Sequence, residues 1–93
     1  MPSTITPIVF FYTYVLRSDK DGDNYIGYSH DLKKRSEEHK KGLVPATKHR
    51  RPLKLIYYEA CLNKEDAQQR ERYLKTTRGR RWFGMRLRNY KSV

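Results

Sequence analysis

The sequence predicts an α+β domain in which a small three-stranded antiparallel sheet is packed by three helices, in the order β-β-α-β-α-α. Three observations favour this class. An early stretch is apolar at both of its alternating sets of positions, a second strand follows it after a short polar loop, and the second half of the chain has two segments with helical spacing. With 93 residues, the chain makes one domain.

The predicted strands are short and rich in aliphatic and aromatic residues. Residues 1–7, with two prolines, are expected to be a flexible arm, and the domain is expected to span residues 8–93. From Ile8 to Leu16 both faces are apolar, as in the central strand of a sheet. A polar loop from Ser18 to Asp23 leads to a second strand, so these two form an antiparallel hairpin. The second and third strands are residues 24–29 and 53–61.

Three helices complete the predicted fold, each with signals at its start or end. The first runs from about Asp31 to Lys41, with Ser29 or Asp31 as its N-cap and Gly42 after its end. A second starts after Asn63 and runs to about Thr76. The last lies near residues 78–90 and has one apolar stripe, made by Phe83, Leu87 and Tyr90, with Trp82 beside it.

Charge indicates the class of partner. The chain has 21 Lys and Arg against 10 acidic residues, a net charge of +11 and a pI near 10.0. Such a field on a small body attracts polyanions, above all nucleic acid. The alternative is a merely soluble basic protein or a ribosome-associated one. The single Cys61, in an apolar stretch, is expected to be a buried thiol in the reducing cytoplasm, and no apolar run is long enough to span a membrane.

Two helices are predicted to direct polar side chains toward the protein body. Leu32 marks the inward side of the first helix, and the residues three, four and seven positions later are Arg35, Ser36 and His39. On the second helix, the apolar stripe also contains Glu71. Because burying an unpaired charge costs on the order of several kcal/mol, these groups either pair with each other or line a wet cleft. A cleft is favoured, and the alternative is a buried ion pair between Glu71 and Arg35 that only stabilises the core.

These residues recur in a known pattern. The tripeptide Tyr25-Ile26-Gly27, preceded by Tyr12-Thr13-Tyr14, resembles the name motifs of the GIY-YIG nuclease family, found in homing endonucleases, in an excision-repair subunit and in structure-selective resolvases. The segments that look like further family blocks are residues 31–35 with His39, residues 47–59 and residues 67–75. The resemblance covers residues 11–90 and is closest to the small stand-alone bacterial members.

The resemblance implies a metal-dependent endonuclease that hydrolyses phosphodiester bonds in DNA, in repair or recombination. It implies that Tyr14 and Tyr25 touch the scissile phosphate or the attacking water, that Arg35 steadies the phosphate and that Glu71 holds one divalent cation, Mg or Mn. His39 matches a helper position. Because a free tyrosine with a pKa of about 10 is hardly ionised at neutral pH, Tyr14 as a base is expected to need positive charge from Arg35 and His39 or the metal. Many family members have a late asparagine near the metal, and Asn89 is the candidate for that position in this chain.

Nucleic-acid contacts are predicted at Gly27, where a missing side chain lets a ligand or another backbone approach, and at a set of cations. Those cations are Lys48, Arg50, Arg51, Lys54, Lys75, Arg78 and Arg80. The partner is expected to be nucleic acid, above all DNA, and a protein partner that supplies substrate specificity is left open. The alternative function is a catalytically silent nucleic-acid-binding module of the same fold, which has no need of an inward carboxylate facing a polyanion.

Overall fold

A computed structural model describes residues 8–90 of the chain, so the predicted arm at residues 1–7 and the last three residues lie outside it. The predicted α+β class and the three-stranded antiparallel sheet are both confirmed. No helix within residues 8–90 has the length and apolar character needed to cross a membrane. The elements are β1 (Phe11–Ser18), β2 (Asn24–Ser29), α1 (Leu32–Lys40), the 3-10 helix η1 (Lys48–Arg50), β3 (Leu53–Cys61), α2 (Lys64–Leu74) and α3 (Thr77–Arg86).

The sheet has the order β2-β1-β3, and β1 pairs antiparallel with both neighbours. This central place explains why β1 is apolar on both of its faces. The predicted start of β1 at Ile8 is wrong, because the ladder begins with the pair Phe11 and Cys61. Residues 8–10 precede the ladder and are exposed. The strand also continues past Leu16, since Ser18 still pairs with Leu53.

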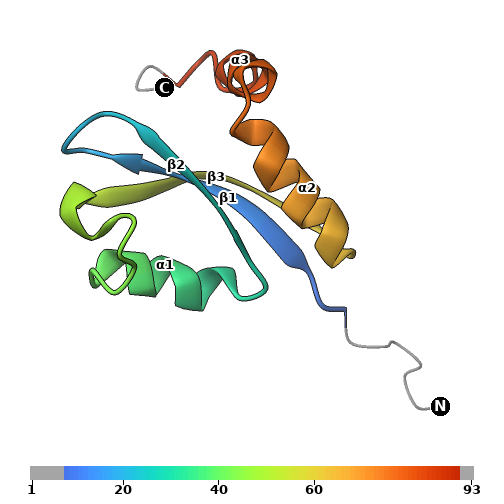
Figure 1. Ribbon diagram of the computed structural model, residues 1–93, viewed down its shortest axis with the longest axis horizontal. Coiled ribbons are helices and arrows are strands. Elements are labelled where there is room, and N and C mark those ends of the chain that lie inside the picture. The colour runs from blue at the N-terminus through green and yellow to red at the C-terminus, as the bar shows by residue number, and fades with distance from the viewer. Residues whose placement is uncertain (1–7, 91–93) are drawn as a thin grey trace.

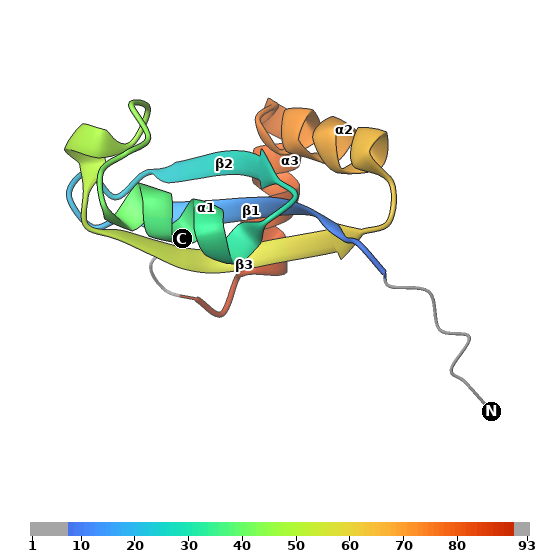
Figure 2. The ribbon, with the colours of Figure 1, turned by 90° about the horizontal axis from the view of Figure 1, so that it is seen from below.

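Helices cover the two faces of the sheet unequally. Figures 1 and 2 show α1 on one face and α2 with α3 on the other. On the α2 and α3 face, Val15, Leu74 and Phe83 form the buried apolar cluster, and Ile26 packs against it. Thr13 points the same way and donates a hydrogen bond to the carbonyl of Ala67, at 2.8 Å. The core therefore lies between the sheet and the two C-terminal helices.

The helix ends follow the capping signals. Asp31, rather than Ser29, is the N-cap of α1, and its carboxylate accepts from the amide of Lys34 at 3.1 Å. Asn63 caps α2 by accepting from the amide of Asp66 at 2.9 Å. Gly42 follows α1 with a φ of +77°, a conformation that glycine adopts without a steric penalty.

A tight corner joins α2 to α3 and corrects the predicted end of α2. Thr76 is not part of α2. Its hydroxyl donates to the carbonyl of Tyr73 at 2.6 Å and accepts from the amide of Gly79 at 3.0 Å, so it caps α3. Gly79 is buried here, and a Cβ at this position would overlap the backbone of Tyr73. The close approach of the two helices thus requires glycine.

Two further expectations are wrong. The last helix ends at Arg86, so of the predicted stripe only Phe83 lies within the helix, while Leu87 is its C-cap and Tyr90 belongs to a following turn. Cys61 is partly exposed rather than buried, because it ends the edge strand β3, and its thiol donates to the carbonyl of Asn63 at 3.3 Å. Neither difference alters the order of the elements.

The two glycines of α3 give a matched test of the corner. We expect Gly79→Ala to lower the free energy of unfolding by roughly 2 kcal/mol or more, since backbone atoms cannot move aside. Gly84→Ala should instead be neutral or stabilising by up to about 1 kcal/mol, because nothing lies within 4 Å of a Cβ there. Urea unfolding of both variants measures this. Equal effects of the two substitutions would contradict the proposed close packing.

Candidate active site

The ring of Tyr14 lies across Gly27 of the neighbouring strand. The two residues are register partners in the ladder between β1 and β2, and a Cβ on Gly27 would overlap the end of the Tyr14 ring, including its hydroxyl oxygen. Gly27 was expected to leave room for a ligand or another backbone, and in the structure the ring of Tyr14 takes that room. Gly27 is therefore needed to let the Tyr14 hydroxyl extend over β2.

A buried chain of hydrogen bonds starts at this hydroxyl. The Tyr14 oxygen lies 2.7 Å from Nε2 of His39, and Nδ1 of His39 lies 2.7 Å from Oγ1 of Thr47. The exposed fractions of these residues are 1% for Tyr14, 1% for His39 and 0% for Thr47. Three side chains from β1, α1 and the loop before η1 thus meet in a place that water hardly reaches.

Burial shifts the pKa values of Tyr14 and His39 in the directions that favour their neutral forms. Burial raises the pKa of Tyr14 to about 12, although a hydrogen bond from Arg35 opposes the shift. Burial also lowers the pKa of His39 to about 4, and the positive charge of Arg35 adds to that effect. His39 is therefore neutral near pH 7 and does not supply the positive charge that the sequence led us to expect.

Tyr25 and Arg35 lie around the buried chain and are more accessible. The Tyr25 ring packs edge-on against the His39 ring, with centroids 5.2 Å apart. Arg35 donates to Glu38 at 3.2 Å, and its side chain is 37% exposed. Arg35 and Glu38 also line a hollow of about 280 Å³ at the start of α1. A ligand in this hollow can therefore reach Arg35, and Tyr25 is partly exposed.

Glu71 reaches the same group of residues from α2. Its negative charge is the smallest of the causes that shift the pKa of Tyr14, and it raises that pKa. The Glu71 side chain is 22% exposed, and Lys75 donates to it at 3.1 Å. The alternative ion pair is not formed, because Glu71 pairs with Lys75 and Arg35 pairs with Glu38.

The five predicted catalytic residues thus form two layers. Tyr14 and His39 are the inner layer, and Tyr25, Arg35 and Glu71 are the partly exposed outer layer. Sequence reasoning missed Thr47, which completes the inner layer. Its only signal is a polar side chain at the start of a cationic run, and a loop has no periodicity that would indicate which way it points.

One carboxylate is available to hold a metal at this place. Within residues 8–90, no three His, Cys, Asp or Glu side chains gather in a way that could hold an ion by themselves. Glu71 offers a hard oxygen ligand, and its side chain is partly exposed. Mg²⁺ commonly binds through one or two carboxylates, several waters and substrate phosphates, so the donor set fits such an ion.

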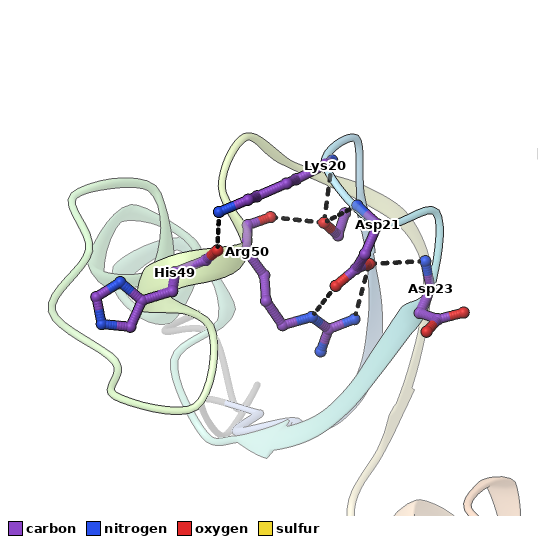
Figure 3. A network of polar contacts seen from close by, with 6 residues as sticks. Lys20, Asp21, Asp23, His49 and Arg50 are labelled. Carbon is purple, nitrogen blue, oxygen red and sulfur yellow. Dashed lines mark hydrogen bonds and ion pairs between the residues drawn. The ribbon is translucent and has the colours of Figure 1, made fainter.

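Several of the cations predicted to contact nucleic acid are already paired with acids. Arg50 donates to Asp21 at 2.8 Å, Lys54 lies 3.5 Å from Asp19, and Lys75 pairs with Glu71. Figure 3 shows how the first of these pairs ties the turn between β1 and β2 to η1. The Arg50 charge thus serves to hold this turn in place, a structural role that the sequence did not indicate.

A basic hollow lies beside η1 and the end of α1. It measures about 670 Å³, and its lining carries four Lys or Arg side chains and no acid. Two of them, Lys48 and Arg51, were predicted from the sequence to contact nucleic acid, whereas Lys20 and Lys40 were not. The lining residues are Lys20, Lys40, Lys48, His49, Arg51, Pro52 and Leu53. Arg78 and Arg80 lie apart from this hollow, on α3.

Comparison with known proteins gives a consistent result. The family described as the GIY-YIG catalytic domain matches residues 10–87. The UPF0213 protein of Clostridium perfringens is 42% identical over 65 residues, which are 69% of each chain. The UPF0213 protein YazA of Bacillus subtilis is 43% identical over 63 residues, which are 67% of this chain and 63% of YazA. No solved structure matches the chain significantly.

The neutral state of His39 predicts an acid-sensitive fold. Because the pKa of His39 is about 4 when folded and about 6.5 when unfolded, the unfolded chain binds an extra proton between these values. The stability that neutral His39 contributes is therefore complete above pH 6.5. It decreases as the pH is lowered, by roughly 2 to 3 kcal/mol at pH 4.5. Urea unfolding at pH 7 and pH 4.5 measures the loss. The His39→Gln variant should lose clearly less unfolding free energy between pH 7 and pH 4.5 than the wild type. An equal loss would contradict the conclusion that His39 is buried in its neutral form.

Proposed function

The chain belongs to the GIY-YIG family, and from that premise we propose that it is a divalent-metal-dependent endonuclease that hydrolyses phosphodiester bonds in DNA. The proposal is supported by the influence of three residues on one hydroxyl group, since Arg35, Tyr25 and Glu71 all act on the pKa of Tyr14. The family resemblance favours a role in DNA repair or recombination, and the single Cys61 fits a cytoplasmic location.

Glu71 is the residue that we propose holds the cation, Mg or Mn. A bound divalent cation would neutralise charge on the phosphate and stabilise the leaving oxygen. Lys75, whose side chain is 52% exposed, pairs with Glu71 through a helical i to i+4 contact. Such exposed pairs contribute little to stability, so Lys75 can move aside at small cost.

Arg35 is the residue that we propose binds the scissile phosphate. Its guanidinium is permanently charged and can donate two parallel hydrogen bonds, which suits a phosphate whose negative charge grows during attack. Its partner Glu38 lies one helical turn further along α1 and is itself partly exposed. The pair holds the guanidinium beside Tyr14 in the absence of substrate.

The two tyrosines are proposed to have different roles. Tyr14 is 1% exposed and has a raised pKa of about 12, so it is poorly suited to meet an attacking water directly. Tyr25 is partly exposed, and its ring lies against His39. We therefore assign the contact with the attacking water to Tyr25, and to Tyr14 the positioning of the groups around it.

The basic hollow is proposed to bind the sugar-phosphate backbone next to the site. His39 is followed at once by Lys40, and Thr47 by Lys48, so the hollow begins where the buried chain of hydrogen bonds ends. Arg78 and Arg80 on α3 offer further contacts. Lysine and arginine side chains bind phosphates without regard to sequence, which suits an enzyme that recognises the shape of its substrate.

Glu71→Gln separates cleavage from binding. The substitution keeps the size of the side chain but removes the charge that holds the cation, so cleavage should fall by orders of magnitude. Affinity for DNA without metal should stay equal or rise, because one negative charge facing phosphate is gone. A nicking assay with Mg or Mn on branched and linear substrates measures the first effect, and a binding titration measures the second.

The control for this variant is Glu37→Gln, which removes an exposed carboxylate from α1 and should leave cleavage unchanged. Thermal melts of both variants show whether the fold is intact. If folded Glu71→Gln protein cuts at the wild-type rate, Glu71 has no part in the reaction. If the wild type binds but cuts none of the substrates with either metal, the chain is the silent binding module.

Binding should weaken steeply with salt, because each phosphate contact releases condensed counterions. We expect Lys40→Gln and Lys48→Gln each to reduce the slope of log affinity against log salt by about one unit. Lys64→Gln, on the first turn of α2 and outside the hollow, is the matched control and should leave the slope unchanged. A flat titration of the wild type would point to a protein partner instead.

A further inference from the structure

Thr47 is a buried residue to which the family resemblance gives no role. Its side chain is 0% exposed, and its hydroxyl oxygen lies 2.7 Å from Nδ1 of His39. Within residues 8–90, the structure gives this hydroxyl no other hydrogen-bond partner. The whole hydrogen-bonding capacity of the Thr47 hydroxyl is thus directed at one nitrogen of the residue that touches Tyr14.

The backbone holds Thr47 firmly in this place. Its amide donates to the carbonyl of Val44 at 3.1 Å, and its carbonyl accepts from the amide of Arg50 at 2.9 Å, which closes η1. Val44 is 4% exposed, and the carbonyl of Arg50 accepts from the hydroxyl of Ser18 at 2.6 Å. The loop is therefore anchored to the end of β1, and the hydroxyl cannot easily turn away from His39.

Hydrogen-bond accounting decides which way the protons point. A neutral imidazole has one N–H donor and one acceptor nitrogen. If Nδ1 carried the hydrogen, it would donate to Thr47, and the hydroxyl hydrogen of Thr47 would be buried without an acceptor. Such an unsatisfied donor is expensive in a site that excludes water. If Nε2 carries the hydrogen, Thr47 donates to Nδ1 and His39 donates to Tyr14. The hydroxyl hydrogen left over then belongs to Tyr14, which, unlike Thr47, has further polar groups acting on it, the Tyr25 hydroxyl and the Glu71 carboxylate.

We propose that Thr47 is a positioning residue that holds His39 in its Nε2–H form, so that His39 donates to the Tyr14 oxygen and leaves the Tyr14 hydrogen free for the reaction site. Arg35 also acts on the Tyr14 hydroxyl and lowers its pKa. With His39 as the donor, the Tyr14 hydrogen turns away from His39 and toward Tyr25, whose ring packs against the same imidazole. A hydrogen bond given there favours the ionised form of its acceptor, and Tyr25 can take a proton from water only when it is ionised.

The tautomer can be measured on the protein whether or not it cuts DNA. In ¹⁵N-labelled wild-type protein, we expect His39 to show a protonated Nε2 and a hydrogen-bonded, unprotonated Nδ1. Thr47→Ser keeps a hydroxyl and should keep both signals. Thr47→Val has nearly the same shape without the donor, so its Nδ1 signal should move to the position of a nitrogen that accepts no hydrogen bond. A protonated Nδ1 in the wild type would overturn the proposal.

The consequence for catalysis rests on the proposed nuclease function. Thr47→Val should lower kcat by about tenfold, the loss expected for one hydrogen bond, while KM and metal-free DNA affinity stay unchanged. Thr47→Ser should retain most of the wild-type kcat, which a purely space-filling role would not require. Equal rates for the two variants would overturn the positioning role. If Thr47→Val does not fold, the tautomer of His39 in the wild type and the kcat of Thr47→Ser still test the role of Thr47.

The two proposals can fail separately. If Glu71→Gln abolishes cleavage while folded Thr47→Val cuts like the wild type, the nuclease assignment holds and the role of Thr47 is wrong. If no substrate is cut but the wild type shows the Nε2–H form with Thr47 donating to Nδ1, the positioning of His39 is correct and the nuclease assignment fails.

Discussion

The hydrogen bond between Tyr14 and His39 is the contact on which the placement of α1 against the sheet depends. His39 is the one buried residue of α1, so this helix has no apolar stripe to hold it there. The bond lies where neither partner can turn to water instead, and breaking it would leave a buried polar group unsatisfied, at a cost of about 1 to 3 kcal/mol. It forms because Gly27 leaves room for the Tyr14 ring. The same contact therefore attaches a helix and sets the geometry of the candidate site.

The alternation of side chains along the sheet directs the tyrosines of the candidate site and the core residues to opposite faces. Thr13 and Val15 face α2 and α3 and contribute to the core, while Tyr14, between them, faces α1. The neighbouring strand repeats the division, with Ile26 in the core and Tyr25 against His39. Because successive residues of a strand point to opposite faces, a few positions suffice for both tasks. Tyr14, Tyr25 and His39 can thus gather on one face while the apolar cluster packs on the other.

Ion pairs organise the surface without reducing its excess of positive charge. The five pairs in the described residues join one cation to one acid each, so the net charge of +11 is unchanged. Their effect is local. Asp21 and Arg50 connect two loops, whereas Glu59 binds Arg70, which lies 4.1 Å above the ring of Trp82 and so links β3, α2 and α3. The cations that line the basic hollow have no acid in that lining, and they concentrate positive potential there.

The sequence by itself determined the fold class, the order of the elements and most of their ends, because strand alternation, helix spacing and caps such as Asp31 and Asn63 are local signals. It also indicated that Arg35, His39 and Glu71 face inward. The start of β1 depended on where a partner strand lies, and the end of α2 on the corner built by Thr76 and Gly79. Only the tertiary structure decided that His39 is neutral, that Glu71 pairs with Lys75, and that Thr47 completes the inner layer. Burial and the pairing of distant groups set these properties, and both arise only when the chain has folded.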